Sequence, residues 1–98
     1  MASIFPISAE RVFEMVEKGQ RVELRLQLGT PRSTGENFLC SVQILGIQGD
    51  KVFEIAGEDS LQALQLAVKF AGTLLQAEQE QGSKITWLGV DDLGLGIF

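Results

Sequence analysis

Two adjacent carboxylates, Asp91 and Asp92, stand among glycines near the end of the chain and are of the residue type that binds divalent cations. Together with Glu58 they would supply the acidic groups of a weak metal-dependent hydrolase. An EF-hand loop, however, needs carboxylates at alternating positions and a glutamate at its twelfth position. Neighbouring carboxylates on an extended chain also point to opposite faces. We therefore expect a solvated turn here and no metal.

The residue types that most often perform catalysis are missing. The chain has no histidine and a single cysteine, Cys40. Ser-His-Asp and Cys-His arrangements are therefore impossible within the chain, and the commonest general base and metal ligand are absent from it. Cys40 shares a strand face with apolar Phe38 and Val42, which predicts a small buried side chain rather than a reactive thiol. The composition argues against an enzyme and predicts no cofactor.

Ser60 lies in the run GEDSL, which looks like the attachment site of acyl and peptidyl carrier proteins. Those carriers are helical before the serine, whereas the residues here alternate as strands do. In a second interpretation the run is simply the start of a helix. Asp59 caps the helix, and Gln62 three residues later completes a capping box. We adopt the cap and keep a carrier or small-molecule-binding domain that uses Ser60 as an alternative function.

Two further positions are candidate binding residues. Arg32 and Glu36 lie in TPRSTGEN, residues 30–37, where glycine and hydroxyl groups could hold an anion. No Walker lysine follows, so the segment favours an ordinary hairpin loop. Trp87 is expected to pack in the core, although tryptophan is also favoured at interfaces. The candidate binding residues are thus Trp87, Asp91, Asp92, Arg32 and Glu36.

Charge and composition limit the partners. The 98 residues include 13 acidic and 8 basic ones, a formal net charge of −5. This argues against nucleic acid and anionic lipid and permits a basic protein partner. No apolar run approaches the ~18 residues of a membrane span. The opening residues MASIFPIS lack the pattern of a signal peptide, and the lone cysteine fits a reducing compartment, so we expect a cytoplasmic protein.

Three stretches alternate apolar and polar residues with the period of two that is typical of half-buried strands. They cover residues 21–29, 37–47 and 52–57, with a loop at 30–37 and a tight turn at 48–51. A further strand is expected at 84–90. The segment 8–19 fits either a helix or a strand, and the compact turn at 17–20 favours a strand.

Residues 60–81 follow the period of a helix. Its polar side chains fall on one narrow stripe, and the apolar arc opposite is wider than one sheet face requires. This predicts a helix that is deeply buried or shared with a partner. The polar stripe consists of Gln62, Gln65, Lys69, Thr73 and Gln76.

These elements predict a single α+β domain over residues 1–98. An antiparallel sheet of four to five strands, from about 8–57 and 84–90, would carry one long helix, about 60–81, on one face. The strand at 37–47 is expected at an edge with few charges to guard it, which predicts a homodimer.

The combination of GEDSLQALQLA (57–67), ITWLG (85–89) and DLG (92–94) resembles an uncharacterised family of small bacterial proteins, a domain of unknown function. The resemblance implies that the serine run is that family's helix start. It also supports a strand at ERVFEM (10–15), and it implies no activity.

We expect a non-enzymatic protein–protein interaction module, such as an immunity or regulatory protein. Its partner would be another protein, of basic character, or a second copy of the chain. Charge complementarity would steer such an association.

Overall fold

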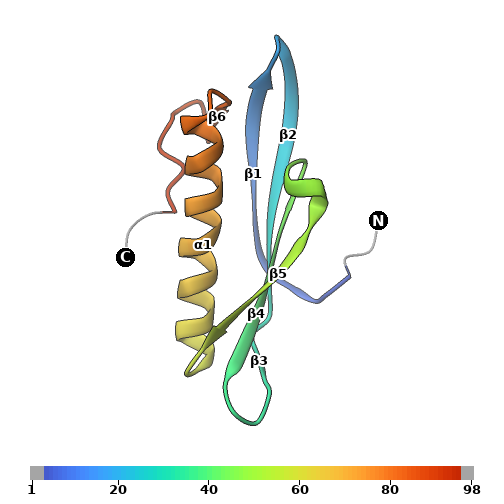
Figure 1. The fold of residues 1–98 in the computed structure, drawn as a ribbon, viewed down its shortest axis with the longest axis vertical. Helices are drawn as coiled ribbons and strands as arrows, with labels where there is room; N and C mark the ends of the chain where they lie inside the picture. The colour runs from blue at the N-terminus through green and yellow to red at the C-terminus, as the bar shows by residue number, and fades with distance from the viewer. Residues whose placement is uncertain (1–3, 96–98) are drawn as a thin grey trace.

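The computed structural model describes residues 4–95 and has one helix laid across one face of a six-stranded antiparallel sheet (Figure 1). This is the α+β fold that the sequence predicts, with more strands than expected. The additional strand is β3, Arg32–Ser33, which lies inside the segment predicted as a loop. Two residues are too few for the alternation of apolar and polar side chains to reveal a strand.

The remaining elements lie close to their predicted bounds. The ambiguous first segment is the strand β1, Ile7–Glu17, and is followed by β2, Gln20–Gly29, β4, Phe38–Leu45, and β5, Val52–Gly57. A short 3-10 turn, Gln48–Asp50, separates β4 from β5. The helix α1 covers Ser60–Glu80. The last strand, β6, is only Lys84–Thr86, and the rest of the predicted strand 84–90 forms a turn.

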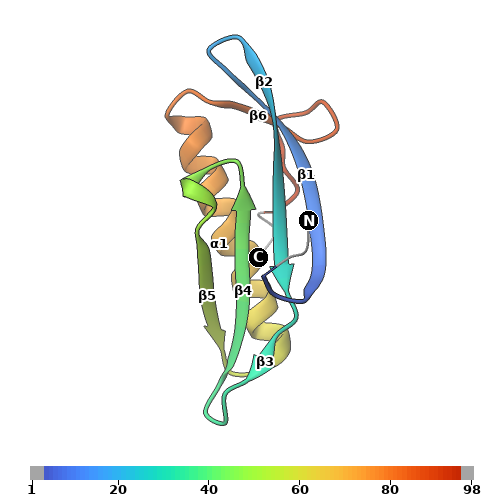
Figure 2. The same cartoon turned by 90° about the vertical axis from the view of Figure 1, so that its right-hand side faces the viewer.

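Strands β1, β2, β4 and β5 lie side by side in chain order, as in a meander. The strand after the helix, β6, pairs with β1, which is far from it in the sequence. Neighbouring strands follow the order β3-β4-β2-β1-β6, and β5 pairs with β4. Leu39 of β4 pairs with both Arg32 and Ala56, so β3 and β5 lie on opposite edges of β4. The helix therefore carries the chain from β5, at one edge, to β6, beside β1 at the other (Figure 2).

The place of β4 corrects one prediction. The sequence predicts a poorly guarded edge at residues 37–47, but β4 pairs with β2 and β3 on one side and with β5 on the other. Its free backbone edge is covered within the chain because β5 folds back on it, and its buried apolar residues belong to the core under α1. A homodimer cannot form along this strand, since its backbone groups are already paired.

The buried face of α1 consists of three alanines and one leucine. Ala63, Ala67, Ala71 and Leu75 recur every four residues and are fully buried. The polar stripe predicted on the helix faces solvent. The sheet residues beneath the helix alternate as predicted and are buried side chains: Phe13, Met15, Leu24, Leu26, Leu28, Cys40, Val42, Ile44 and Ile85.

The opposite face of the sheet is polar and carries a network of charged side chains. Arg25 in β2 binds Glu10 of β1 at 2.8 Å and Glu23 of its own strand at 2.9 Å. Exposed pairs of this kind contribute about 1 kcal/mol or less each. Within residues 4–95, no helix has the length and apolar content needed to cross a membrane.

Candidate functional site

The segment after β6 forms a tight turn that points a leucine into solvent. Trp87 and Val90 exchange two backbone hydrogen bonds of 2.9 and 3.1 Å. Between them, Leu88 has φ +53° and Gly89 has φ +84°. Positive φ at both central residues is the pattern of a type I′ turn, which favours Asn-Gly because a Cβ strains the left-handed region. The Leu88 side chain is 83% exposed.

Arg11 holds this turn against the sheet. It shares a strand face with Phe13 and Met15, so it points toward the helix side. Its guanidinium lies 3.6 Å from the centre of the Trp87 ring and donates to the carbonyl oxygens of Leu93, at 3.0 Å, and Gly94, at 3.4 Å. One cation thus fixes an aromatic ring and the closing loop together.

Gly94 is needed where the loop crosses Arg11 and Trp87. A Cβ at residue 94 would lie 2.9 Å from the Trp87 ring and 3.0 Å from the Arg11 guanidinium. Its φ of +70° is also one that glycine adopts without strain. The loop can therefore lie flat on the guanidinium only with glycine at this position.

The aspartate pair shapes the loop that follows. A carboxylate oxygen of Asp92 accepts from the Gly94 amide at 2.9 Å. The Asp91 carbonyl accepts from Gln79 at 3.2 Å, and the same Gln79 amide donates to Ile85 at 3.0 Å. These contacts fasten the loop to the end of α1. Both aspartates border a shallow groove of about 370 Å³ against the polar side of the helix.

Exposed apolar side chains gather at this corner of the molecule. Of the six large hydrophobic residues that are exposed within residues 4–95, three belong to it: Val12 (41%), Leu88 (83%) and Val90 (54%). We call these three residues the Leu88 surface. A hollow of about 460 Å³ lies between Leu88 and Val12. Its polar lining comes from Glu14, Arg21, Glu23 and Thr86.

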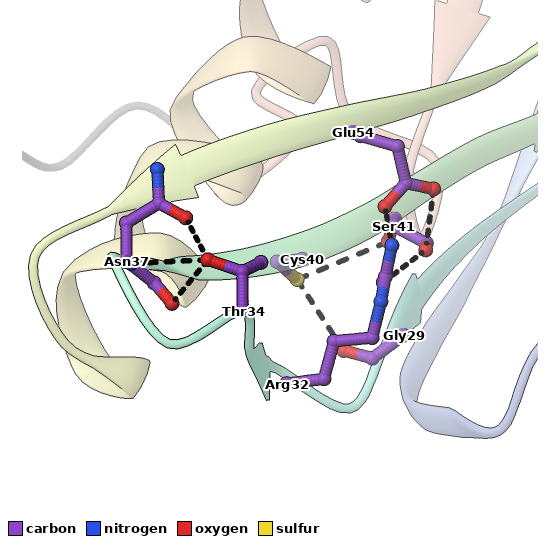
Figure 3. A network of polar contacts seen from close by, with 7 residues as sticks. All are labelled: Gly29, Arg32, Thr34, Asn37, Cys40, Ser41 and Glu54. Carbon is purple, nitrogen blue, oxygen red and sulfur yellow. Dashed lines mark hydrogen bonds and ion pairs between the residues drawn. The ribbon is translucent and has the colours of Figure 1, made fainter.

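Arg32 is the first residue of β3, which lies at the other end of the long axis, near the start of α1 (Figure 1). It pairs with Glu54 of β5 at 2.6 Å and donates to the Ser41 hydroxyl at 3.3 Å. Ser41 in turn donates to Glu54 at 2.8 Å (Figure 3). The guanidinium is thus used within the fold. Glu36 is exposed in the adjoining loop, where its amide donates to Thr34 at 3.3 Å.

Cys40 lies behind this network, on the helix side of β4. It is fully buried, and its thiol donates to the Gly29 carbonyl at 3.3 Å. Burial, reinforced by the negative charge of Glu54, raises the pKa of the Cys40 thiol above its ordinary value of 9.0. The thiolate, which is the nucleophilic form, is therefore disfavoured.

The helix start has the predicted cap. Asp59 has extended backbone angles, and its carboxylate accepts from the Gln62 amide at 2.7 Å. The Gln62 side chain accepts from the amide of Glu58, one residue before the cap, at 2.6 Å. Ser60 is the exposed first residue of α1, directly after a strand and a two-residue corner.

The structure divides the predicted site residues into two groups. Trp87 stacks on Arg11, and Asp91 and Asp92 belong to the loop whose later carbonyls Arg11 binds, whereas Arg32 and Glu36 belong to β3 and the loop that follows it. Glu58 precedes the helix whose far end contacts Asp91, so about 30 Å of helix separates Glu58 from Asp91 and Asp92, and the three carboxylates considered for a hydrolase do not meet.

Sequence reasoning missed Arg11, Ser41, Glu54 and Leu88 as parts of these groups. A signal existed for Arg11, since it falls on the same alternation as Phe13 and Met15 and so belongs to the buried side. The sequence also contains a signal for Leu88. It is followed by Gly89, a common turn residue, within the predicted strand 84–90. The partners of Arg32 come from separate strands, and only the register of β3, β4 and β5 reveals them.

Comparisons with known proteins identify a family but no function. The family described as "Domain of unknown function (DUF6968)" matches residues 9–97. The searches matched no curated protein and no solved structure to the chain.

Proposed function

We propose that this chain, which belongs to the DUF6968 family of domains of unknown function, is a protein-binding module that docks through the Leu88 surface. The observation that carries the proposal is Leu88 itself. It is the most exposed of the large hydrophobic side chains in the described residues, and it sits at a strained backbone position.

Leu88 is poorly suited to a purely structural role. The left-handed region costs a residue with a Cβ about 1–2 kcal/mol, and a side chain that is 83% exposed recovers little of this by burial. Asparagine would form the same turn at lower cost. Local strain of this kind is characteristic of functional positions, and a partner that buries the leucine would supply the missing gain.

The surroundings of Leu88 resemble the anatomy of an interface. Exposed Val12 borders the same hollow as Leu88, whose rim is formed by charged side chains, and exposed Val90 follows in the same turn. Such a centre supplies most of the binding energy, while the rim excludes water. Arg11 and Trp87 hold the turn in place before binding, so less conformational entropy is lost on association.

The charge of the rim selects the partner. Glu14 and Glu23 line the hollow together with one basic residue, Arg21, and Asp91 and Asp92 follow the turn in the sequence. The other nearby arginines are engaged within the fold: Arg11 stacks on Trp87, and Arg25, which pairs with Val12 across the strands, binds Glu10 and Glu23. Arg21 is itself 3.6 Å from Glu14. With the chain at a formal net charge of −5, the best complement is an apolar pocket ringed by lysine or arginine on another protein.

Site-specific photocrosslinking tests this proposal. A photoreactive amino acid replaces Leu88 in one variant and Leu61 in a matched control, since Leu61 is also exposed but lies at the start of α1. Both are expressed in the cells that produce the chain. We expect position 88 to label one protein with a basic surface, and position 61 to leave it unlabelled. The labelled protein, once purified, should bind the chain more weakly as salt rises.

Equal labelling from both positions would contradict the proposal, because contact would then not be specific to this corner. Binding of the purified protein that is independent of salt would contradict the part of the proposal that concerns charge.

A further inference from the structure

We infer that β5 is a dimerisation edge: a second copy of the chain adds its own β5 in antiparallel pairing, with Ile55 facing the partner's Ile55. This inference is independent of the Leu88 surface, which lies at the opposite edge of the sheet. The two copies would form one continuous sheet with both helices on the same face.

The outer edge of β5 is open. Over its six residues the strand pairs with β4 alone within the described chain, and the pairing runs without a bulge (Figure 2). Natural edge strands are shielded by proline, lysine, bulges or short length. Between Val52 and Gly57 there is no proline or lysine, and Glu54 is the one charged residue. The nearest lysine, Lys51, precedes the strand, and its ammonium lies 5.1 Å from the centre of the Phe53 ring. At the opposite edge, β6 has three residues, one of them Lys84.

An apolar border runs beside this open edge on the helix side. Phe53 and Ile55 are only half-buried, and the Phe70 ring meets Phe53 edge-on with centres 4.9 Å apart. Leu66 lies one helical turn before Phe70, on the same side of α1, and is 39% exposed. A second copy placed along β5 would cover these side chains, and the wide apolar arc of the helix would then be used.

Symmetry restricts the register. The two β5 strands are related by a two-fold axis perpendicular to the sheet, which keeps both helices on the same face. Residues that pair across the axis must then point to the same face of the sheet. Ile55 on the axis places Glu54 opposite the partner's Ala56, and Phe53 opposite the partner's Gly57. Placing Glu54 on the axis would instead oppose two carboxylates, which is destabilising. Of the two central registers, the one centred on Ile55 avoids this repulsion and sets large residues against small ones.

The test is a pair of opposite charges at residue 56. Ala56 is exposed on the polar face, so neither variant disturbs the core. In the proposed register each dimer has two symmetry-related contacts between residue 56 of one copy and Glu54 of the other. Ala56→Glu makes both contacts repulsive, and Ala56→Lys makes both attractive. Sedimentation equilibrium should show a wild-type dimer, with the dissociation constant raised roughly 2- to 30-fold by Ala56→Glu and lowered or unchanged by Ala56→Lys.

A wild-type protein that stays monomeric over a wide concentration range would overturn the inference. So would variants that shift the dissociation constant in the same direction, or that leave it unchanged together, because each result is incompatible with this register. Circular dichroism and thermal melts establish that both variants are folded.

Hydrogen exchange of the unmodified protein gives an independent measurement. Protection of the β5 amides that point away from β4 should rise with protein concentration, while amides in the β1–β2 turn should not change. Protection of β5 that is independent of concentration would also overturn the inference.

Discussion

Asp59 stabilises α1 through the hydrogen bond that its carboxylate accepts from the Gln62 amide at 2.7 Å. This contact satisfies one of the four amides that a helix start leaves without a partner. We predict that Asp59→Ala lowers the free energy of unfolding by about 1 kcal/mol. Ser60→Ala, the matched control, should change it by less than about 0.5 kcal/mol because Ser60 is exposed. Urea denaturation measures both, and equal losses would contradict this assignment of the cap.

Cys40 makes stability depend on alkaline pH. Burial raises the pKa of its thiol in the folded state above 9.0, the value expected once the chain unfolds. Below that pH the thiol is protonated in both states and the free energy of unfolding is unaffected. Above it the unfolded state loses its proton first, so stability must fall as pH rises.

We therefore predict that the wild type loses more stability than Cys40→Ser between neutral pH and pH values above 9.0. The serine variant is the control because lysines and other groups titrate in the same range. Denaturation at a series of pH values gives the comparison. Parallel curves for the two proteins would contradict the buried, protonated thiol.

The corner between β5 and α1 is tightly packed around Gly57. A Cβ at Gly57 would lie 2.3 Å from the backbone nitrogen of Ala63, and neither backbone segment can move without displacing the helix. We predict that Gly57→Ala lowers the free energy of unfolding by about 1–3 kcal/mol or more. Glu58→Ala, at the exposed next residue, should stay within about 0.5 kcal/mol. Thermal and urea unfolding test the pair, and a wild-type midpoint for Gly57→Ala would refute the packing described.

Arg11 joins the closing loop to the sheet through two carbonyls and the Trp87 ring. We predict that Arg11→Gln, which cannot span the ring and both carbonyls, speeds amide hydrogen exchange at Val90 and Gly94. The amide of Leu26, in the centre of β2, should be unchanged. Unaltered exchange at Val90 would show that the turn is held by other contacts.

Most elements follow from the periodicity of the sequence, and the exceptions have physical reasons. The long strands and the helix have enough residues for their apolar patterns to be read, as in β2 and α1. The end of β6 was missed because Trp87 and Val90 look like strand residues although positive φ at Leu88 turns the chain. Strand neighbours depend on contacts between distant residues, so the interior position of β4 could not be predicted locally. The contacts of Arg32 with Ser41 and Glu54 could not be predicted for the same reason, since these residues lie on other strands.

At the scale of the whole molecule, the two proposed surfaces lie on opposite edges of one sheet. Pairing through β5 would leave both copies' Leu88 surfaces at the outer ends of a continuous sheet, beside β6. Two identical docking sites on a rigid frame can engage a multivalent partner with an avidity well above the affinity of one site. A monomer would retain one docking site, so the two proposals can fail independently.

The most direct test of the docking role is Leu88→Asn, titrated calorimetrically against the partner identified by crosslinking. Asn-Gly is a favoured type I′ pair, so the variant should unfold with a free energy equal to the wild type or up to about 1 kcal/mol higher. Its affinity should fall at least about 10-fold, since an apolar anchor is lost. Leu61→Asn should bind as the wild type does. Wild-type affinity for Leu88→Asn would contradict docking through this surface.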